Sequence, residues 1–258
     1  MIRRSFLYKK KMRIILAFIF VITSLSGFAQ FKSARELVHK MYVDVKENPM
    51  AGFTFRQETI RYRTDTLSGD TSTWYEAIQY PDKFRIDFGD PAEGNAVLYK
   101  NDSAYIFKGG QLDKSRFEPM PLLFLEGGMA FYPFKAVMPR LQELGLDTSI
   151  LSKQDWMGKS YWVLGAKPGD LNARQVWVDA NSLMPIRRLD PHPSGKTIEL
   201  VYKNFKDFDG HQIETRVDIF VEGKFIQKEF YHDIDPNPSI PEDFFEPSKF
   251  GASHWLKN

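Results

Sequence analysis

Five histidines are the side chains of this 258-residue chain best suited to acid–base or metal chemistry at neutral pH. They are His39, His192, His211, His232 and His254. No two have the i, i+4 spacing of a helical zinc motif, and neither a G-x-S-x-G turn nor a phosphate-binding glycine loop occurs. The run 232–235 (HDID) could contribute to a metal site, but we favour a solvated strand end. We therefore expect no enzyme activity, no metal and no cofactor.

Composition narrows the classes of function further. The chain has no cysteine, which excludes disulfides, thiolate catalysis, iron–sulfur clusters and a lipid anchor on an N-terminal cysteine. Six of the 35 Lys and Arg lie before position 30 and none of the 33 Asp and Glu does, so the rest has 29 bases against 33 acids, a net charge of −4. Nucleic-acid binding needs a concentrated basic surface, and we expect no nucleic-acid partner.

The first 29 residues have the pattern of a secretory signal peptide. Arg3, Arg4 and three lysines at 9–11 precede an apolar stretch over 14–25, and Gly27 and Ala29 mark a cleavage site before residue 30. The pattern predicts a soluble periplasmic protein, 30–258, without a lipid anchor. An uncleaved anchor is the alternative, although a membrane span needs roughly twenty apolar residues. Arg3-Arg4 also allows twin-arginine export, but the absence of a cofactor motif favours general secretion.

The elements expected after this segment are one helix, a series of strands and two short helices between the strands. Ser33 and Glu36 form a capping box for a helix with apolar residues at helical spacing, which Asn48-Pro49 ends. Side chains then alternate with period two over 53–62, 73–80 and 84–88, and a hairpin is expected over 96–107. Short helices are predicted at 119–125 and 136–144, with Pro139 at the start or at a kink of the second.

Strands resume from 150 to 232, which gives about ten or eleven antiparallel strands in all. The tail after Pro236 is rich in proline and should be irregular, with Phe244 and Phe245 as a plug. No linker or repeat divides the chain. The fold class predicted is therefore mainly β (α+β), with one domain over 30–258.

Aromatic residues are numerous, with 22 Phe, 11 Tyr and 5 Trp, and they suggest an apolar cavity or groove. Strand alternation puts several on one face, so that they could form a cavity wall, while an apolar run in the first short helix could form a lid. The wall candidates are Phe53, Phe55, Trp74, Phe84, Ile86 and Phe88, and the lid candidates are Leu122, Leu123 and Phe124. Residues of an ordinary core would show the same pattern, and the spacing alone does not separate the two interpretations.

Four local motifs stand out along the chain. They are the first strand at 52–57 (GFTFRQ), the turn and strand at 80–87 (YPDKFRID), the hairpin at 101–107 (NDSAYIF), and the hairpin from 176–179 (VWVD) to 183–187 (LMPIR). Together they resemble the LolA/LolB superfamily of periplasmic carriers. Their order and spacing extend over nearly all of 30–258. One position departs from the pattern, because Tyr80 stands where well-studied carriers have an arginine tied to cargo transfer.

The resemblance implies a curved, incomplete antiparallel β-barrel with an N-terminal helix and short lid helices, and acyl chains held between sheet and lid. It implies a monomeric carrier of acylated lipoproteins or other lipids, which accepts cargo from an inner-membrane release complex and delivers it to an outer-membrane acceptor. It adds Tyr80 to the candidate cavity residues. A lipid-sensing or regulatory module on the same fold, acting through a protein partner, is the alternative that the sequence leaves open.

Overall fold

The computed structural model describes residues 30–62, 69–192, 194–251 and 254–256. At position 122 it describes only the backbone. The predicted signal peptide therefore lies outside the described residues. The strands are β1 Gly52–Tyr62, β2 Gly69–Gln79, β3 Lys83–Phe88, β4 Ala96–Lys100, β5 Ser103–Lys108, β6 Gln111–Phe117, β7 Leu151–Trp156, β8 Lys159–Leu164, β9 Gln175–Asp179, β10 Pro185–Pro191, β11 Thr197–Lys203, β12 Lys206–Phe208, β13 His211–Ile213, β14 Arg216–Val221 and β15 Lys224–Asp235.

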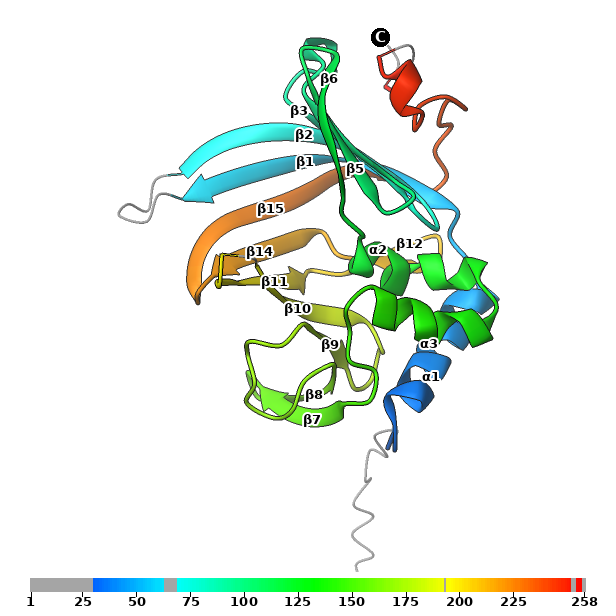
Figure 1. Cartoon of the computed structure of the whole chain (residues 1–258), viewed down its shortest axis with the longest axis vertical. Coiled ribbons are helices and arrows are strands. Elements are labelled where there is room, and N and C mark those ends of the chain that lie inside the picture. Colours follow the sequence, from blue (N-terminus) through cyan, green and yellow to red (C-terminus); the bar gives the residue numbers. More distant parts are fainter. Residues whose placement is uncertain (1–29, 63–68, 193, 252–253, 257–258) are drawn as a thin grey trace, which may run out of the picture.

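One antiparallel sheet of 13 strands forms the frame, in the order β6-β5-β4-β3-β2-β1-β15-β14-β11-β10-β9-β8-β7, and β12 and β13 form a separate hairpin. The sheet curves strongly, but its edge strands β6 and β7 do not pair, so the barrel is incomplete (Figure 1). This confirms the predicted fold class. The described residues form 15 strands where ten or eleven were expected, and β6, β12 and β13 are three of the additional ones.

Local sequence signals explain several elements. Ser33 accepts a hydrogen bond from the Glu36 N–H (3.2 Å) at the start of α1 (Ala34–Glu47), as predicted, although Glu36 itself accepts from the Lys32 N–H (2.8 Å). Asn101 and Asp102 have φ values of 50° and 57°, which suits the tight turn between β4 and β5.

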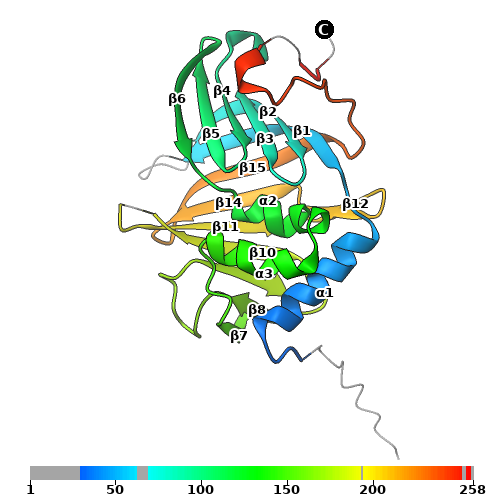
Figure 2. The same ribbon diagram turned by 45° about the vertical axis from the view of Figure 1, so that its right-hand side comes forward.

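The helices cover one half of the concave face (Figure 2). They are α1, α2 (Pro121–Glu126) and α3 (Phe134–Glu143), with the 3₁₀ turn η2 (Gly128–Phe131) between the last two. Pro139 lies inside α3, not at its start. Leu37 and Leu141 from these helices pack on Trp162 and Val176 of β8 and β9, and the result is a continuous apolar core. The other short 3₁₀ helices are η1 (Pro91–Glu93) and η3 (Pro247–Lys249).

The C-terminal segment lies on the opposite, outer face of β2–β5. Phe244 and Phe245 are buried beside Ala77 of β2, as expected of a plug. Phe250 stacks on Phe107 of β5 with ring centroids 3.8 Å apart. Apart from η3, this segment is irregular, as its prolines predicted. The outer face of β2–β5 is thus covered, while the inner face of β2 and β3 borders a cavity.

Candidate binding cavity

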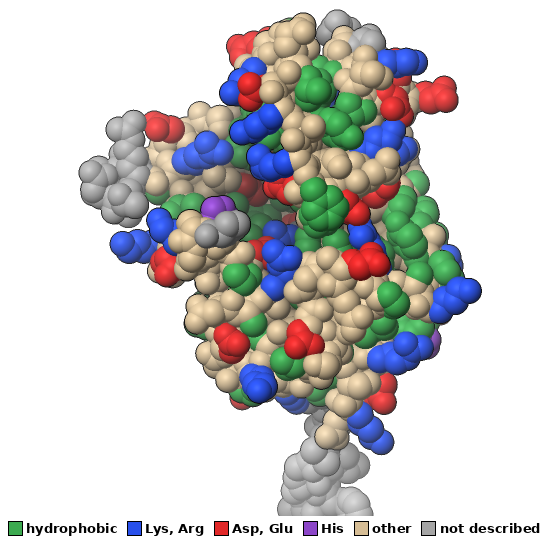
Figure 3. Space-filling view, viewed as in Figure 1, with side chains coloured by type: hydrophobic (Ala, Val, Ile, Leu, Met, Phe, Trp, Pro, Cys, Tyr) green, Lys and Arg blue, Asp and Glu red, His purple; other side chains and the backbone are tan. Residues whose placement is uncertain are grey.

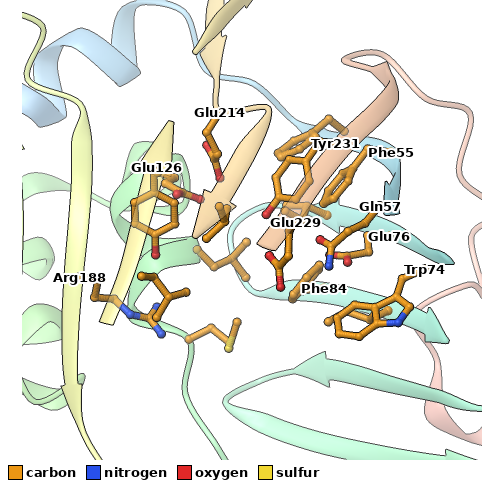
Figure 4. A pocket seen from close by; sticks show the side chains of 18 residues that line it. Phe55, Gln57, Trp74, Glu76, Phe84, Glu126, Arg188, Glu214, Glu229 and Tyr231 are labelled. Atoms are coloured by element: carbon orange, nitrogen blue, oxygen red, sulfur yellow. The ribbon is translucent and has the colours of Figure 1, made fainter. Parts of the chain in front are cut away.

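A cavity of about 160 Å³ lies between the concave face of the sheet and α2. Its lining comes from β1, β2, β3, β10, β11, β14 and β15, with α2 and the residues next to these elements (Figure 4). The space-filling view shows this side of the molecule hollowed between the β4–β6 arm and the helices, with hydrophobic and acidic side chains in the hollow (Figure 3). The lining residues are Phe53, Phe55, Gln57, Trp74, Glu76, Ile78, Phe84, Ile86, Met120, Leu123, Glu126, Arg188, Leu200, Tyr202, Glu214, Val217, Glu229 and Tyr231.

Strand alternation builds the apolar part of the wall. Phe53 and Phe55 project from β1 with ring centroids 5.4 Å apart, and Tyr231 of β15 lies 4.3 Å from Phe55. Phe84 and Ile86 project from β3 on the same side. Aromatic and aliphatic side chains of this kind suit contact with hydrocarbon, since removing apolar surface from water is favourable at about 25 cal/mol per Å².

Six of the ten residues predicted to line a cavity do line it. They are Phe53, Phe55, Trp74, Phe84, Ile86 and Leu123. Phe88 is on the same face of β3 but packs edge-on against Trp74 at 4.9 Å, outside the lining. Phe124 is buried in the core with α1 and α3, and Leu122 belongs to α2.

The short helix α2 occupies the place predicted for a lid. Leu123 and Glu126 line the cavity, whereas Phe124 and Leu125 anchor the same helix in the core on its other side. No side chain caps its N-terminus at Met120, and its six residues make fewer than two turns of helix. Only one side of α2 therefore borders the cavity, which explains why the predicted lid residues divide between the cavity and the core.

Tyr80 is 5% exposed and supports α2 without lining the cavity. Its ring packs with Phe53, Phe55 and Leu123. Burial, with smaller contributions from Glu126 and Glu214, raises its pKa well above the ordinary value, so its hydroxyl is neutral. A Cβ on Gly127 would lie 2.6 Å from the Tyr80 ring, so only glycine allows the end of α2 to approach this closely.

Four carboxyl groups also line the cavity, and sequence reasoning missed them. Glu76 comes from β2, Glu126 from α2, Glu214 from the segment before β14, and Glu229 from β15. Burial raises the pKa of each, to about 7 for Glu214 and Glu229, and well above the usual range for Glu76 and Glu126. A signal existed for Glu76, because it alternates with Trp74 and Ile78 on the apolar face of its strand.

The cavity's guanidinium, Arg188, already has a partner. Its Nε lies 2.5 Å from the Asp190 Oδ2, and the other oxygen of Asp190 lies 2.9 Å from the Arg174 Nε. The carboxyls are not grouped as a metal site, since the described residues contain no cluster of three or more His, Cys, Asp or Glu arranged to hold a metal ion. The arrangement is that of a binding cavity with apolar walls and acidic groups.

None of the helices in the described part of the chain combines the length and hydropathy that a membrane span requires.

Comparisons with known proteins agree on the fold. No protein-family model and no curated protein sequence matches the chain. Among solved structures, a LolA superfamily protein from Nitrosomonas europaea is 16% identical with a TM-score of 0.53, and the match covers 83% of this chain and 97% of that one. A DUF1329 family protein from Desulfovibrio piger is 13% identical with a TM-score of 0.55 (84% and 97% covered).

A structure from Vibrio parahaemolyticus, described as an outer membrane lipoprotein-sorting protein domain, is 11% identical with a TM-score of 0.55, again with 84% of this chain and 97% of that one covered. Identities this low show the fold alone. The chain has a LolA-like fold, as the sequence motifs predicted.

Proposed function

We propose that this protein is a periplasmic carrier that shields the acyl chains of lipoproteins or other lipids and moves them from the inner to the outer membrane. The cavity between the curved sheet and α2, with aromatic side chains from the four neighbouring strands β3, β2, β1 and β15, carries this proposal. The LolA-like fold supports it, since one similar structure is described as a lipoprotein-sorting domain. The partners would be an inner-membrane release complex and an outer-membrane acceptor. Holding and releasing a chain requires no catalysis and no cofactor.

The size of the cavity bears on how cargo would enter. A dry apolar cavity of about 150 Å³ takes a molecule the size of benzene, and this one has about 160 Å³. A complete acyl chain therefore needs more room than the structure provides. We propose that α2 moves aside as the chain enters, with Leu123 and Met120 as the first contacts. At about 0.8 kcal/mol for each methylene, burying six would contribute about 5 kcal/mol.

The test is native mass spectrometry of the protein purified from the periplasm without detergent, followed by organic extraction. Acylated species bound to the wild type should be lost in Phe84→Glu, because a carboxylate in the wall disfavours hydrocarbon. Leu112→Glu is the matched control, since Leu112 is 53% exposed on the edge strand β6 and lies outside the cavity. A wild-type protein that carries no lipid and also fails to bind a fluorescent fatty acid contradicts the carrier.

The same preparation tests the proposed export. The full chain is expressed, and the mass of the periplasmic form is measured. Cleavage of a signal peptide before Gln30 predicts a protein that begins at this residue. A periplasmic protein that retains residues 1–29 would show that the segment is an uncleaved anchor.

A further inference from the structure

The cavity contains an acceptor that no group of the described residues satisfies. Glu76 is 3% exposed, and its Oε1 has no hydrogen-bond partner among the described residues. Its side chain lies in the cavity lining near Gln57 and Glu229, which come from the two strands beyond β2 (Figure 4). An unsatisfied buried polar group costs about 1–3 kcal/mol, so its retention calls for an explanation.

Glu229, by contrast, is held in place. The Gln227 Nε2 donates to the Glu229 Oε1 at 2.5 Å, and the Arg61 Nε donates to the Gln227 Oε1 at 2.9 Å. These two hydrogen bonds hold the carboxyl of Glu229 in place, whereas the carboxyl of Glu76 has an oxygen without a partner among the described residues. The guanidinium of Arg61 reaches Gln227 and the Trp74 ring (5.4 Å), and Arg188 is paired with Asp190. No cation of the described residues is therefore bonded to the Glu76 Oε1.

We propose that the cargo of this cavity carries a protonated amine beside its apolar chain, and that Glu76 and Glu229 receive the ammonium group. This inference rests on the proposed carrier function and names the chemistry of its cargo. An ammonium group has three donors and no acceptor, which complements carboxylates that only accept. An anionic head group would instead oppose the ionisation of the four carboxyls, and a hydroxyl supplies no positive charge that would stabilise their ionised form.

The state of the carboxyls fits a site that becomes ionised when the ligand binds. Burial, and then the charge of Glu229, raise the pKa of Glu76, so without a cation it favours its neutral form. An ammonium group nearby lowers the pKa of both Glu76 and Glu229, and the site releases protons as the amine binds. The remaining titratable groups around it are Glu126 and Glu214, which are acidic, and Tyr202 and Tyr231, whose raised pKa keeps them neutral.

The test compares three probes with the same twelve-carbon chain, namely dodecylammonium, dodecanol and dodecanoate, by calorimetry on the full mature protein. We expect dodecylammonium to bind at least about tenfold more tightly than dodecanol at pH 7.5, and dodecanoate to bind most weakly. We expect the higher affinity of dodecylammonium, relative to dodecanol, to shrink at pH 5, where the carboxyls are protonated. Repeating the titration in buffers of different ionisation enthalpy should show proton release for the amine alone.

Variants assign the effect to these residues. Glu76→Gln and the double variant Glu76→Gln, Glu229→Gln should bring the ratio of dodecylammonium to dodecanol affinity toward one. Glu58→Gln is the control with an unchanged ratio, since Glu58 projects from the opposite face of β1. Circular dichroism verifies that each variant is folded, and the single Glu76 variant keeps the test decisive if the double variant unfolds.

The outcomes separate the two proposals. Equal binding of the amine and the alcohol, or tightest binding of dodecanoate, overturns the amine proposal and leaves the carrier standing. Failure of all three probes to bind contradicts the carrier itself. With the amine preference established, a diacylated peptide with a free or an acetylated amino terminus, and phosphatidylethanolamine with or without N-acetylation, distinguish a lipoprotein cargo from an aminolipid. Whichever loses affinity on acetylation is the source of the ammonium group.

Discussion

The two faces of β2 and β3 hold buried charges in opposite ways. On the outer face, Arg85 and Asp87 are 2% and 0% exposed and form a two-pronged pair, with Arg85 Nε and Nη2 3.0 and 2.8 Å from the Asp87 oxygens. The guanidinium also donates to the Phe244 carbonyl at 3.2 Å and lies between the rings of Phe244 and Phe250. On the inner face, Glu76 has no such partner.

This difference distinguishes a buried charge pair that supports the structure from a buried carboxyl that is available for binding. The outer pair has its hydrogen bonds made within the chain, and it fastens the C-terminal segment to the sheet. The inner carboxyl is equally buried, but its Oε1 has no hydrogen-bond partner among the described residues. Groups that a fold completes by itself contribute to stability, whereas an incomplete polar group in the wall of a cavity is available to a ligand.

Breaking the outer pair should have the largest effect. Asp87→Asn leaves the Arg85 guanidinium buried without its counter-charge, and we expect a loss of about 3–5 kcal/mol in the free energy of unfolding. Urea denaturation measures it. Asp113→Asn serves as the control, because Asp113 pairs with Lys108 at the surface and should matter by about 1 kcal/mol or less. Equal losses in the free energy of unfolding for the two substitutions would contradict the proposed difference between the two faces.

The cavity face should make the protein less stable as pH rises. The pKa of Glu229 is about 7 in the folded chain against an ordinary 4.5, so between these values the folded protein holds a proton that the unfolded chain has released. The contribution of Glu229 to the free energy of unfolding is therefore complete below about pH 4.5 and is lost as pH rises through 7. This contribution is at most about 3 kcal/mol.

Glu229→Gln should therefore flatten the dependence of the unfolding free energy on pH between 5 and 8. Glu58→Gln, on the other face of β1, should retain the wild-type slope. Urea denaturation at several pH values compares the three proteins. A Glu229→Gln variant with an unchanged slope would show that this carboxyl titrates normally.

The smallest effect should come from the incomplete carboxyl itself. Glu76→Gln replaces a carboxyl that is neutral in the empty cavity by a group of the same size, so we expect the free energy of unfolding to change by less than about 1 kcal/mol. Glu76→Gln and Asp87→Asn make the same chemical change, a carboxyl to an amide, on the two faces of the sheet. A loss comparable to that of Asp87→Asn would show that Glu76 has a structural partner after all.

Much of the fold follows from local patterns in the sequence. The Ser33 cap, the Asn101-Asp102 turn and the alternation of Phe84 and Ile86 each determine their element through contacts within a few residues. Strand β6 gave no such signal, because all seven of its residues are exposed and no face of it is apolar. A strand at the edge of a sheet is determined by its neighbour β5 more than by its own residues.

Alternation in β2 gave a signal for Glu76 alone, and the grouping of the acidic side chains around the cavity could not be predicted from the sequence for a different reason. Glu76, Glu126, Glu214 and Glu229 are far apart along the chain, and only the curvature of the sheet brings them around one space. The burial of Arg85 likewise depends on Phe244 and Phe250, more than 150 residues later. Alternation predicts which face a side chain takes, but what covers that face is a property of the whole chain.

A crystal structure with a bromine-labelled twelve-carbon alcohol or amine would show whether the inner face of the sheet accepts an apolar chain. The anomalous signal of bromine locates the chain without assumptions about its pose. We expect a bromine peak inside the cavity among Phe55, Phe84 and Leu123, with α2 displaced. A peak only on the outer surface, or none in a crystal whose protein binds the probe in solution, would contradict this expectation.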